Sequence, residues 1–404
     1  MQKIKTVADI SCQGKRVFLR ADFNVPLDEK GNVSDDSRVV AALPTIRYLI
    51  QSGAKVILAS HLGRPNGERI IKYSMRNVAL SLAKHLGQPV LFLPDCIGDE
   101  VLHAVNKMAD GTVVLLENLR FYKEETDNDP KFAEALAALA DIYVNDAFGS
   151  AHRAHASTDG ITKFTRENVA GLLMEKELEF LGARIANPER PFVVILGGAK
   201  ISDKISVIYN LLQKANSMLI GGAMAYTFLA AKGISTGSSP VETDKIPVAA
   251  ETIRMAESMG VKLIFPVDHV VAAAFDKETM TATDVSTSDG EIPAGKTGID
   301  IGPRTVELFG SEIASAKTIF WNGPMGIFEM EGSSAGTFAI AKAVARPGVT
   351  SIIGGGDSAR AIAMSGVGNS VSFVSTGGGA GLKFLEGGTL PSVEVLDKLY
   401  NPED

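Results

Sequence analysis

The sequence predicts an α/β protein of two domains, each a mostly parallel sheet covered by helices on both faces. Its 404 residues leave room for two hydrophobic cores. Its composition, with 45% hydrophobic residues, 22% charged residues and 40 glycines, is that of a globular α/β protein. Short apolar runs alternate with amphipathic segments in both halves of the chain, and no short-period repeat indicates a solenoid.

Five apolar runs in the first half are expected to be strands of one sheet. They lie at 17–19, 56–58, 90–93, 113–116 and 142–144, with helical patterns near 37–52, 74–86, 98–109 and 131–140. The second half repeats this alternation with six apolar runs. These lie near 193–196, 218–220, 262–265, 318–321, 350–353 and 371–374.

A helix between the halves is predicted from Met174, Leu178, Leu181 and Ile185, which recur at i, i+4, i+7 and i+11. We interpret it as a connection with a hinge, although one more core-covering helix would show the same pattern. The predicted parts are an N-terminal domain (1–170), a connecting helix (171–186), a C-terminal domain (187–380) and a C-terminal segment (381–404).

Composition argues against several classes of protein. No run of 18 apolar residues could form a membrane span, and the charged start of the chain lacks the apolar region of a secretory signal. The two cysteines, Cys12 and Cys96, are too few for a disulfide framework or a zinc site, so we expect a cytoplasmic protein. The net charge of −7 argues against general nucleic-acid binding.

Arginine or histidine follows four of the first-half strands. The residues are Arg20, His61 with Arg64, Arg120, and His152-Arg153-Ala154-His155. Ligands of open α/β sheets bind at the carboxyl ends of the strands, and arginine forks bind phosphate and carboxylate. The pattern therefore predicts a site for a small anion with several charges, although any single arginine could be a surface ion-pair partner. Because no serine or cysteine nucleophile motif accompanies the histidines, we favour binding roles for them.

Glycine follows the second-half strands instead, at Gly197-Gly198, Gly221-Gly222, Gly323, Gly354–Gly356 and Gly377–Gly379. After Gly198 the sequence predicts a helix whose first turn carries Lys200 and Lys204. Such a turn suits a phosphate chain, and the alternative is an ordinary strand-to-helix turn with solvated lysines. Asp357 could be a magnesium ligand or a helix N-cap.

Two further motifs have competing interpretations. Residues 290–297 match the phosphate-loop pattern letter by letter. However, polar residues 281–289 precede them where a strand is needed, and Gly298 and Pro303 follow where a helix should begin, so we interpret the match as a chance one in a loop. Residues 354–359 fit the dinucleotide pattern G-x-G-x-x-A, so a nicotinamide dehydrogenase is a competitor. The absence of an acidic residue after 371–374 counts against it.

Eight segments, in order, resemble the phosphoglycerate kinase family: RADFNVP, HLGRP, ENLRF, NDAFGSAHRAHAS, LMEKELEFL, LGGAKISDKI, WNGPMGIFE and GGGD. The resemblance runs from Asp22 to Gly379 and implies two Rossmann-like domains. It also implies transfer of a phosphoryl group between 1,3-bisphosphoglycerate and ADP, giving 3-phosphoglycerate and ATP in glycolysis. A monomer with a C-terminal segment that returns to the N-terminal domain is expected as well.

The resemblance also implies the site residues. The phosphoglycerate would be bound by Asp22, Asn24, Arg38, His61, Arg64, Arg120 and Arg153. The nucleotide would be bound by Gly198, Ala199, Lys200, Lys204, Gly222, Asn322, Pro324, Glu329, Gly354, Gly355, Gly356, Asp357 and Ser358. Arg38 and Lys200 would be catalytic, and Asp357 would hold Mg²⁺.

Four departures from the family pattern stand out: Ser358 for threonine, Ala223 for a glycine near the nucleotide base, Phe373 for histidine, and residues 281–298. The change at Ala223 leaves the preferred nucleotide base open. We expect a hinge to close around both substrates. The competing functions are the dehydrogenase and a non-catalytic binding or scaffold protein.

Overall fold

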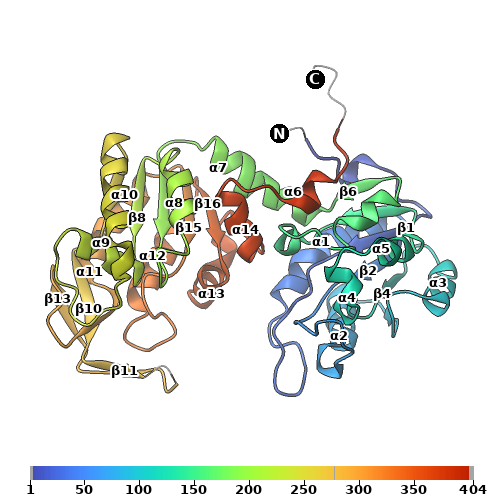
Figure 1. The fold of residues 1–404 in the computed structure, drawn as a ribbon, viewed down its shortest axis with the longest axis horizontal. Helices are drawn as coiled ribbons and strands as arrows, with labels where there is room; N and C mark the ends of the chain where they lie inside the picture. The colour runs from blue at the N-terminus through green and yellow to red at the C-terminus, as the bar shows by residue number, and fades with distance from the viewer. Residues whose placement is uncertain (1–2, 277, 400–404) are drawn as a thin grey trace. The chain divides into compact units, whose positions relative to one another are not determined.

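A computed structural model describes residues 3–276 and 278–399. The chain divides into two compact units (Figure 1). Unit 1 contains residues 1–178 and 389–404, and unit 2 contains residues 179–388. The division falls inside the predicted connecting helix, and the C-terminal segment joins unit 1 from Thr389 onward.

Unit 1 is built on a parallel sheet in the order β3-β4-β2-β1-β5-β6. Its strands are β1 (Arg16–Arg20), β2 (Lys55–Ala59), β3 (Val90–Phe92), β4 (Val113–Leu115), β5 (Ile142–Asn145) and β6 (Asn168–Ala170). The first five are the predicted strands. The short β6 was missed because Asn168–Ala170 contains one bulky apolar residue, Val169, and so gives no apolar run.

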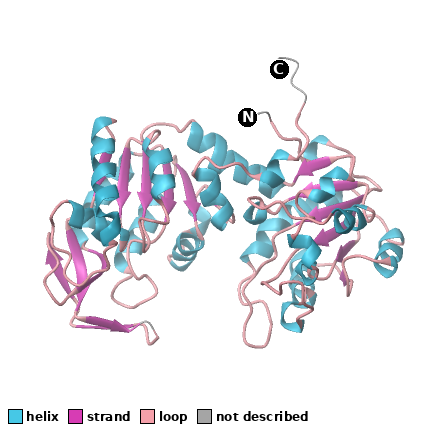
Figure 2. Cartoon of the chain, in the orientation of Figure 1, coloured by secondary structure: helices cyan, strands magenta, loops and turns pink. Residues whose placement is uncertain are grey.

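Helices flank this sheet (Figure 2). They are α1 (Ser37–Gln51), α2 (Arg76–Leu86), α3 (Asp99–Asn106), α4 (Lys123–Thr126), α5 (Pro130–Ala137), α6 (Leu172–Leu178) and α15 (Pro391–Glu394). Short 3₁₀ turns are η1 (Val7–Asp9), η2 (Ile71–Tyr73), η3 (Leu119–Phe121), η4 (Phe148–Ser150) and η5 (Gly160–Lys163). An apolar core that includes Leu19, Leu58 and Val144 packs against one face of the sheet, and Phe18, Ile57 and Tyr143 are buried on the other.

Unit 2 contains a second parallel sheet of six strands, in the order β17-β16-β15-β7-β8-β9. Its strands are β7 (Phe192–Leu196), β8 (Ser217–Ile220), β9 (Lys262–Ile264), β15 (Thr318–Asn322), β16 (Thr350–Gly354) and β17 (Phe373–Val374). All six were predicted. The central strand β7 is buried along its whole length, as its uninterrupted apolar run requires.

The helices of unit 2 are α7 (Arg184–Ala186), α8 (Ile205–Leu212), α9 (Met224–Ala231), α10 (Ile246–Ser258), α11 (Pro303–Ser315), α12 (Ala335–Val344), α13 (Gly356–Met364) and α14 (Gly378–Leu385). Two 3₁₀ turns are η7 (Thr243–Lys245) and η8 (Gly368–Ser370). None of the helices in the described residues is long and apolar enough to cross a membrane.

Antiparallel strands form a separate part of unit 2. Strands β10 (Asp268–Ala272), β13 (Ser286–Asp289) and β14 (Thr297–Ile301) form one small sheet, and β11 (Ala274–Asp276) pairs with β12 (Thr281–Thr283). The interpretation of 281–289 as non-strand was therefore wrong, because exposed strands in a small sheet can be polar on both faces. Residues 290–296 are nevertheless a loop between two strands, and no helix follows them until Pro303.

The predicted connecting helix is helical from Leu172 to Ala186 but not uniform. The α-helix α6 passes into a π-helical segment, η6 (Glu179–Ala183), and then into α7. The change from α to π geometry coincides with the division between the units.

Candidate functional site

Strand register brings the polar loops of unit 1 together. Arg20 at the end of β1 pairs with Ala59 of β2 on one side and with Asn145 of β5 on the other. The chain runs from β1 outward to one edge and returns to β5 on the opposite side, so β1 lies at the topological switch point where open α/β sheets bind ligands. The loops after β2, β4 and β5 carry the predicted Arg64, Arg120 and Arg153.

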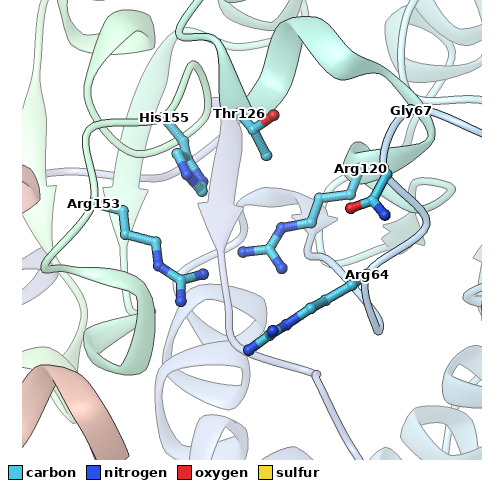
Figure 3. Close-up of a pocket in the computed structure, with 7 residues that line it drawn as sticks. Arg64, Gly67, Arg120, Thr126, Arg153 and His155 are labelled. Carbon is cyan, nitrogen blue, oxygen red and sulfur yellow. The ribbon is translucent and has the colours of Figure 1, made fainter.

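A pocket of about 320 Å³ lies among these loops. It is lined by Arg64, Asn66, Gly67, Arg120, Thr126, Arg153 and His155. The guanidinium groups of Arg64, Arg120 and Arg153 point into the same space (Figure 3). We call Arg20, His61, Arg64, Arg120, Arg153 and His155 the arginine cluster.

Arg120 is the least satisfied member of the arginine cluster. It follows β4 in η3 and is only 6% exposed. One terminal nitrogen, Nη1, donates to the Gly63 carbonyl at 3.2 Å, whereas Nε and Nη2 are buried with no hydrogen-bond partner in the described part of the chain. Burial, followed by the charges of Arg20 and Arg153, lowers the pKa of Arg120 to about 10. A bound anion would accept hydrogen bonds from these two nitrogens and offset the positive charge of the neighbouring arginines.

His61 is held as a neutral imidazole. Nη2 of the fully buried Arg20 lies 3.2 Å from Nδ1 of His61. Because a guanidinium has no acceptor, Nδ1 must be the unprotonated nitrogen, which leaves the proton on Nε2. Burial and the neighbouring arginines lower the pKa of His61 well below its usual range. His61 can therefore donate a hydrogen bond from Nε2 without adding a charge.

A buried carboxylate lies behind the cluster. Glu125 in α4 is fully buried and accepts from the amide and hydroxyl of Ser157, at 2.9 and 2.6 Å. The same hydroxyl accepts from Nε of Arg20 at 2.8 Å. Ser157 thus links the buried carboxylate of Glu125 to the buried guanidinium of Arg20 through two hydrogen bonds. Nδ1 of His155 stands 3.9 Å from Glu125, too far for a hydrogen bond. Burial and the arginines lower the pKa of His155 to about 3.

The other predicted residues of unit 1 lie outside the lining of the pocket. Arg38, in the first turn of α1, donates to the carboxylate of Asp22. The side-chain oxygen of Asn24 accepts from the Gly63 amide at 2.8 Å, which ties the loop after β1 to the loop after β2. These residues hold loops of the site in place.

Four residues at or behind the pocket, Arg20, His155, Glu125 and Ser157, have no role assigned by the family resemblance. A binding role was favoured for His155 from its place after a strand, but the family resemblance did not assign it to the phosphoglycerate. Arg20 was among the strand-end arginines of the predicted anion site, but the family resemblance assigned it no contact with the phosphoglycerate. Glu125 and its partner Ser157 carried no signal, because nothing in the helical sequence around Glu125 shows that its carboxylate is buried.

In unit 2, the lysine loop, Gly197–Lys204, connects β7 to α8. The prediction that Lys200 and Lys204 lie on a helical turn was wrong, since α8 begins only at Ile205. The glycines and the turn at 202–204 delay the helix. Lys200 is exposed, whereas Nζ of Lys204 donates to the carbonyls of Gly197 and Asn322 at 2.6 and 2.9 Å. Burial lowers the pKa of Lys204 to about 8.

The glycines of unit 2 let loops pack backbone against backbone. The amide of Gly198 donates to the Pro324 carbonyl at 3.0 Å, and a Cβ on Gly222 would lie 2.5 Å from the Gly198 nitrogen. Gly222 also has a φ of +64°, which other residues rarely adopt. Loop packing thus accounts for these glycines without a ligand. A Cβ on Gly356, by contrast, would meet no atom within 4 Å.

Gly354, Gly355 and Gly356 lead from β16 into α13. Gly355, with a φ of +87°, is the N-cap of α13, so Asp357 lies in its first turn and the N-cap alternative for Asp357 was wrong. The carboxylate of Asp357 is exposed, next to backbone N–H groups at a helix start. Ser358 is buried, and its hydroxyl accepts from the Gly323 amide at 2.6 Å.

The remaining predicted nucleotide residues lie in the neighbouring loops. The carbonyls of Asn322 and Pro324 bond the lysine loop, and Ala199 is exposed within that loop. Glu329 accepts from Arg360 of α13 at 3.3 Å. Register pairs Asn322 with Leu196 and with Gly354, so three loops meet at one edge of the sheet.

Comparison with known proteins gives one consistent result. A family model described as Phosphoglycerate kinase matches residues 7–388. The phosphoglycerate kinase of Koribacter versatilis is 53% identical over 399 residues, covering 97% of this chain and 98% of the relative. The cytosolic phosphoglycerate kinase of Triticum aestivum is 50% identical over 400 residues, covering 98% and 99%.

A solved structure, the phosphoglycerate kinase from Coxiella burnetii, matches with a TM-score of 0.86 and 37% identity over 97% of this chain and 98% of that one. These matches exclude the dehydrogenase and scaffold alternatives and confirm the resemblance and the fold class. The chain therefore belongs to the phosphoglycerate kinase family and is a phosphotransferase that moves a phosphoryl group between 1,3-bisphosphoglycerate and ADP, which gives 3-phosphoglycerate and ATP.

Proposed function

We propose that the units divide the substrates between them, with phosphoglycerate bound by unit 1 and the nucleotide by unit 2. The observation that carries this proposal is Arg120, which lines a pocket with two further arginines and has two buried nitrogens without a hydrogen-bond partner among the described residues. A phosphate or carboxylate would accept from these nitrogens in bidentate fashion. Of the predicted ligands, Arg64 and Arg153 share this pocket, while Asp22, Asn24, Arg38 and His61 would contribute from the adjacent loops.

For the nucleotide, we propose that Lys200 and the start of α13 hold the phosphates. Mg²⁺ is usually bound by one or two carboxylates together with substrate phosphates. Asp357 fits this pattern, because its carboxylate is exposed and lies in the first turn of α13, where backbone N–H groups point outward. No group of three metal-ligating side chains occurs in the described residues, which agrees with a metal that arrives with the nucleotide. When bound, Mg²⁺ would neutralise negative charge on the phosphates.

The mechanism needs no general base. The nucleophile in the direction of ATP consumption is the carboxylate of 3-phosphoglycerate, which is already ionised near neutral pH. Catalysis then depends on in-line positioning and on cations near the equatorial oxygens of the transferred group. We assign this role to Arg38 and Lys200. The pairing of Arg38 with Asp22 orients the guanidinium before substrate arrives.

Because the two sets of ligands belong to different units, we propose that a hinge closes around both substrates. The π-helical segment η6 supports this proposal, since it lies at the division between the units and π-bulges often occur at functional sites. We also propose a monomer that acts in the cytoplasm: one chain supplies both sets, and the wheat relative is named cytosolic.

The test of the assignment is the coupled assay of ATP formation from 1,3-bisphosphoglycerate and ADP with site variants. Arg120→Met should raise the KM for 1,3-bisphosphoglycerate by at least tenfold, because the loss of one charged hydrogen-bond partner costs about 1.5–3 kcal/mol. The KM for ADP should stay unchanged. Unchanged KM values for both substrates would refute the assignment of unit 1.

A further inference from the structure

Glu242 holds the lysine loop from outside. One carboxylate oxygen, Oε2, accepts from the amides of Ile201 and Ser202 at 2.6 and 3.3 Å. The other, Oε1, accepts from the Ser202 hydroxyl at 2.5 Å. Three donors from two consecutive residues therefore converge on one carboxylate, and hydrogen bonds to an ionised acceptor are the strong ones.

Glu242 is itself fixed by helices. Its amide donates at 3.1 Å to the hydroxyl of Thr227, a buried residue of α9. Directly after it come η7 and α10, and α10 packs against α9. The carboxylate is thus carried by a rigid part of unit 2 and reaches across to a loop that has no regular structure between Gly198 and α8.

The contact matters because of its place in the chain. Ile201 directly follows Lys200, whose own side chain is exposed. A flexible lysine on an irregular loop would sample many positions, whereas clamped amides one and two residues further along fix the backbone from which it extends. The same contact removes the Ile201 and Ser202 amides from the donors available to a phosphate, so phosphate must be held by other groups.

We infer that Glu242 is a positioning residue for Lys200 in phosphoryl transfer, an inference that rests on the proposed role of Lys200. Displacements of about 1 Å can cost a reaction about 100-fold. Glu242→Ala should therefore lower kcat about 10- to 100-fold and leave the KM for 3-phosphoglycerate unchanged. Glu242→Gln, which keeps an oxygen for both amides, should recover most of the activity.

The decisive experiment is a double-mutant cycle with Lys200→Ala, with kcat measured in the full-length enzyme at saturating ATP and 3-phosphoglycerate. If Glu242 acts through Lys200, Glu242→Ala should lower kcat by less than about twofold once Lys200 is absent. The matched control is Glu257→Gln, an exposed glutamate of α10, which should keep wild-type kcat. Thermal unfolding should show that each variant is folded.

The outcomes separate the two claims. Full activity in Lys200→Ala would overturn the proposed role of Lys200 and the inference with it. An impaired Lys200→Ala, together with either wild-type kcat in Glu242→Ala or equal losses from Glu242→Ala in both backgrounds, would overturn the inference alone. If Glu242→Ala does not fold, Glu242→Gln is used in the same cycle, where a residual loss confined to the background with Lys200 supports the inference and an equal loss in both overturns it.

Discussion

Replacing Arg120 with methionine should make the free protein more stable while it weakens phosphoglycerate binding. Burial and neighbouring arginines lower the pKa of Arg120 from its ordinary value of about 12.5 to about 10. At about 1.4 kcal/mol per pKa unit, the charged guanidinium costs the folded state roughly 3 kcal/mol. The cost is present at every pH below about 10 and is relieved only as the pH rises toward 12.5, so it does not vary between pH 6 and 9.

Methionine would remove this cost and fill similar space. It would also remove the hydrogen bond from Arg120 to the Gly63 carbonyl, which contributes about 1 kcal/mol. The expected net gain is about 2 kcal/mol. For a unit of this size that corresponds to a rise in Tm of about 4–8 °C. The gain should be the same at pH 6.5 and pH 8.5.

Calorimetry in the absence and presence of 3-phosphoglycerate measures both effects. Without ligand the variant should melt above the wild type. With 3-phosphoglycerate the difference in Tm between variant and wild type should narrow or change sign, because only the wild type is stabilised by tight binding. Arg166→Met, at an exposed position of the same unit, serves as the control and should change stability by less than about 0.5 kcal/mol. A variant that melts below the wild type without ligand would refute the view that Arg120 is held at a cost.

Further predictions concern pH, positioning, catalysis and closure. His155 has a folded pKa of about 3 against about 6.5 unfolded, so stability should fall as pH drops below 6.5, by about 2 kcal/mol at pH 5, and His155→Gln should flatten urea-unfolding midpoints over that range. Ser392→Ala removes the 2.9 Å hydrogen bond to the Arg153 carbonyl and should raise the KM for 3-phosphoglycerate about three- to tenfold. The affinity for ADP should stay unchanged, which is the check. Lys200→Ala and Arg38→Ala should each lower kcat at least 100-fold with unchanged circular dichroism, and near-normal turnover in either removes that residue from catalysis. Small-angle scattering should show compaction only when both substrates are added, and identical profiles with and without them would count against the hinge.

The sequence predicted the sheets well because parallel strands buried on both faces leave an uninterrupted apolar signal. All six strands of the unit 2 sheet and five of unit 1 were predicted in this way. The signal fails where burial is one-sided or absent, as in β13, whose residues Ser286–Asp289 are polar and mostly exposed. It also fails at the start of α8, since Ile201 and Ile205 share a helical spacing although only Ile205 is in the helix.

For the site, sequence could predict which residues follow each strand but not which of them lack partners. Arg120 and Arg64 look alike in the sequence. In the structure Arg120 is buried, with two nitrogens that have no hydrogen-bond partner among residues 3–276 and 278–399, whereas Arg64 is exposed. That difference depends on Gly63 and on loops from other parts of the chain. No local pattern records it.

The two units prepare for their ligands in different ways. In unit 1 the fold holds buried donors unpaired and histidines neutral, so free energy is stored in the site before the anion arrives. In unit 2 the loops satisfy one another, through Gly198 with Pro324 and through Glu242 with Ile201. The units therefore differ in how they pair their buried cations: among the described residues Arg120 keeps two nitrogens without a partner, whereas Lys204, whose pKa burial also lowers, donates to two carbonyls. It follows that replacing Arg120 should trade binding for stability, whereas replacing Glu242 should lower kcat with no gain in stability.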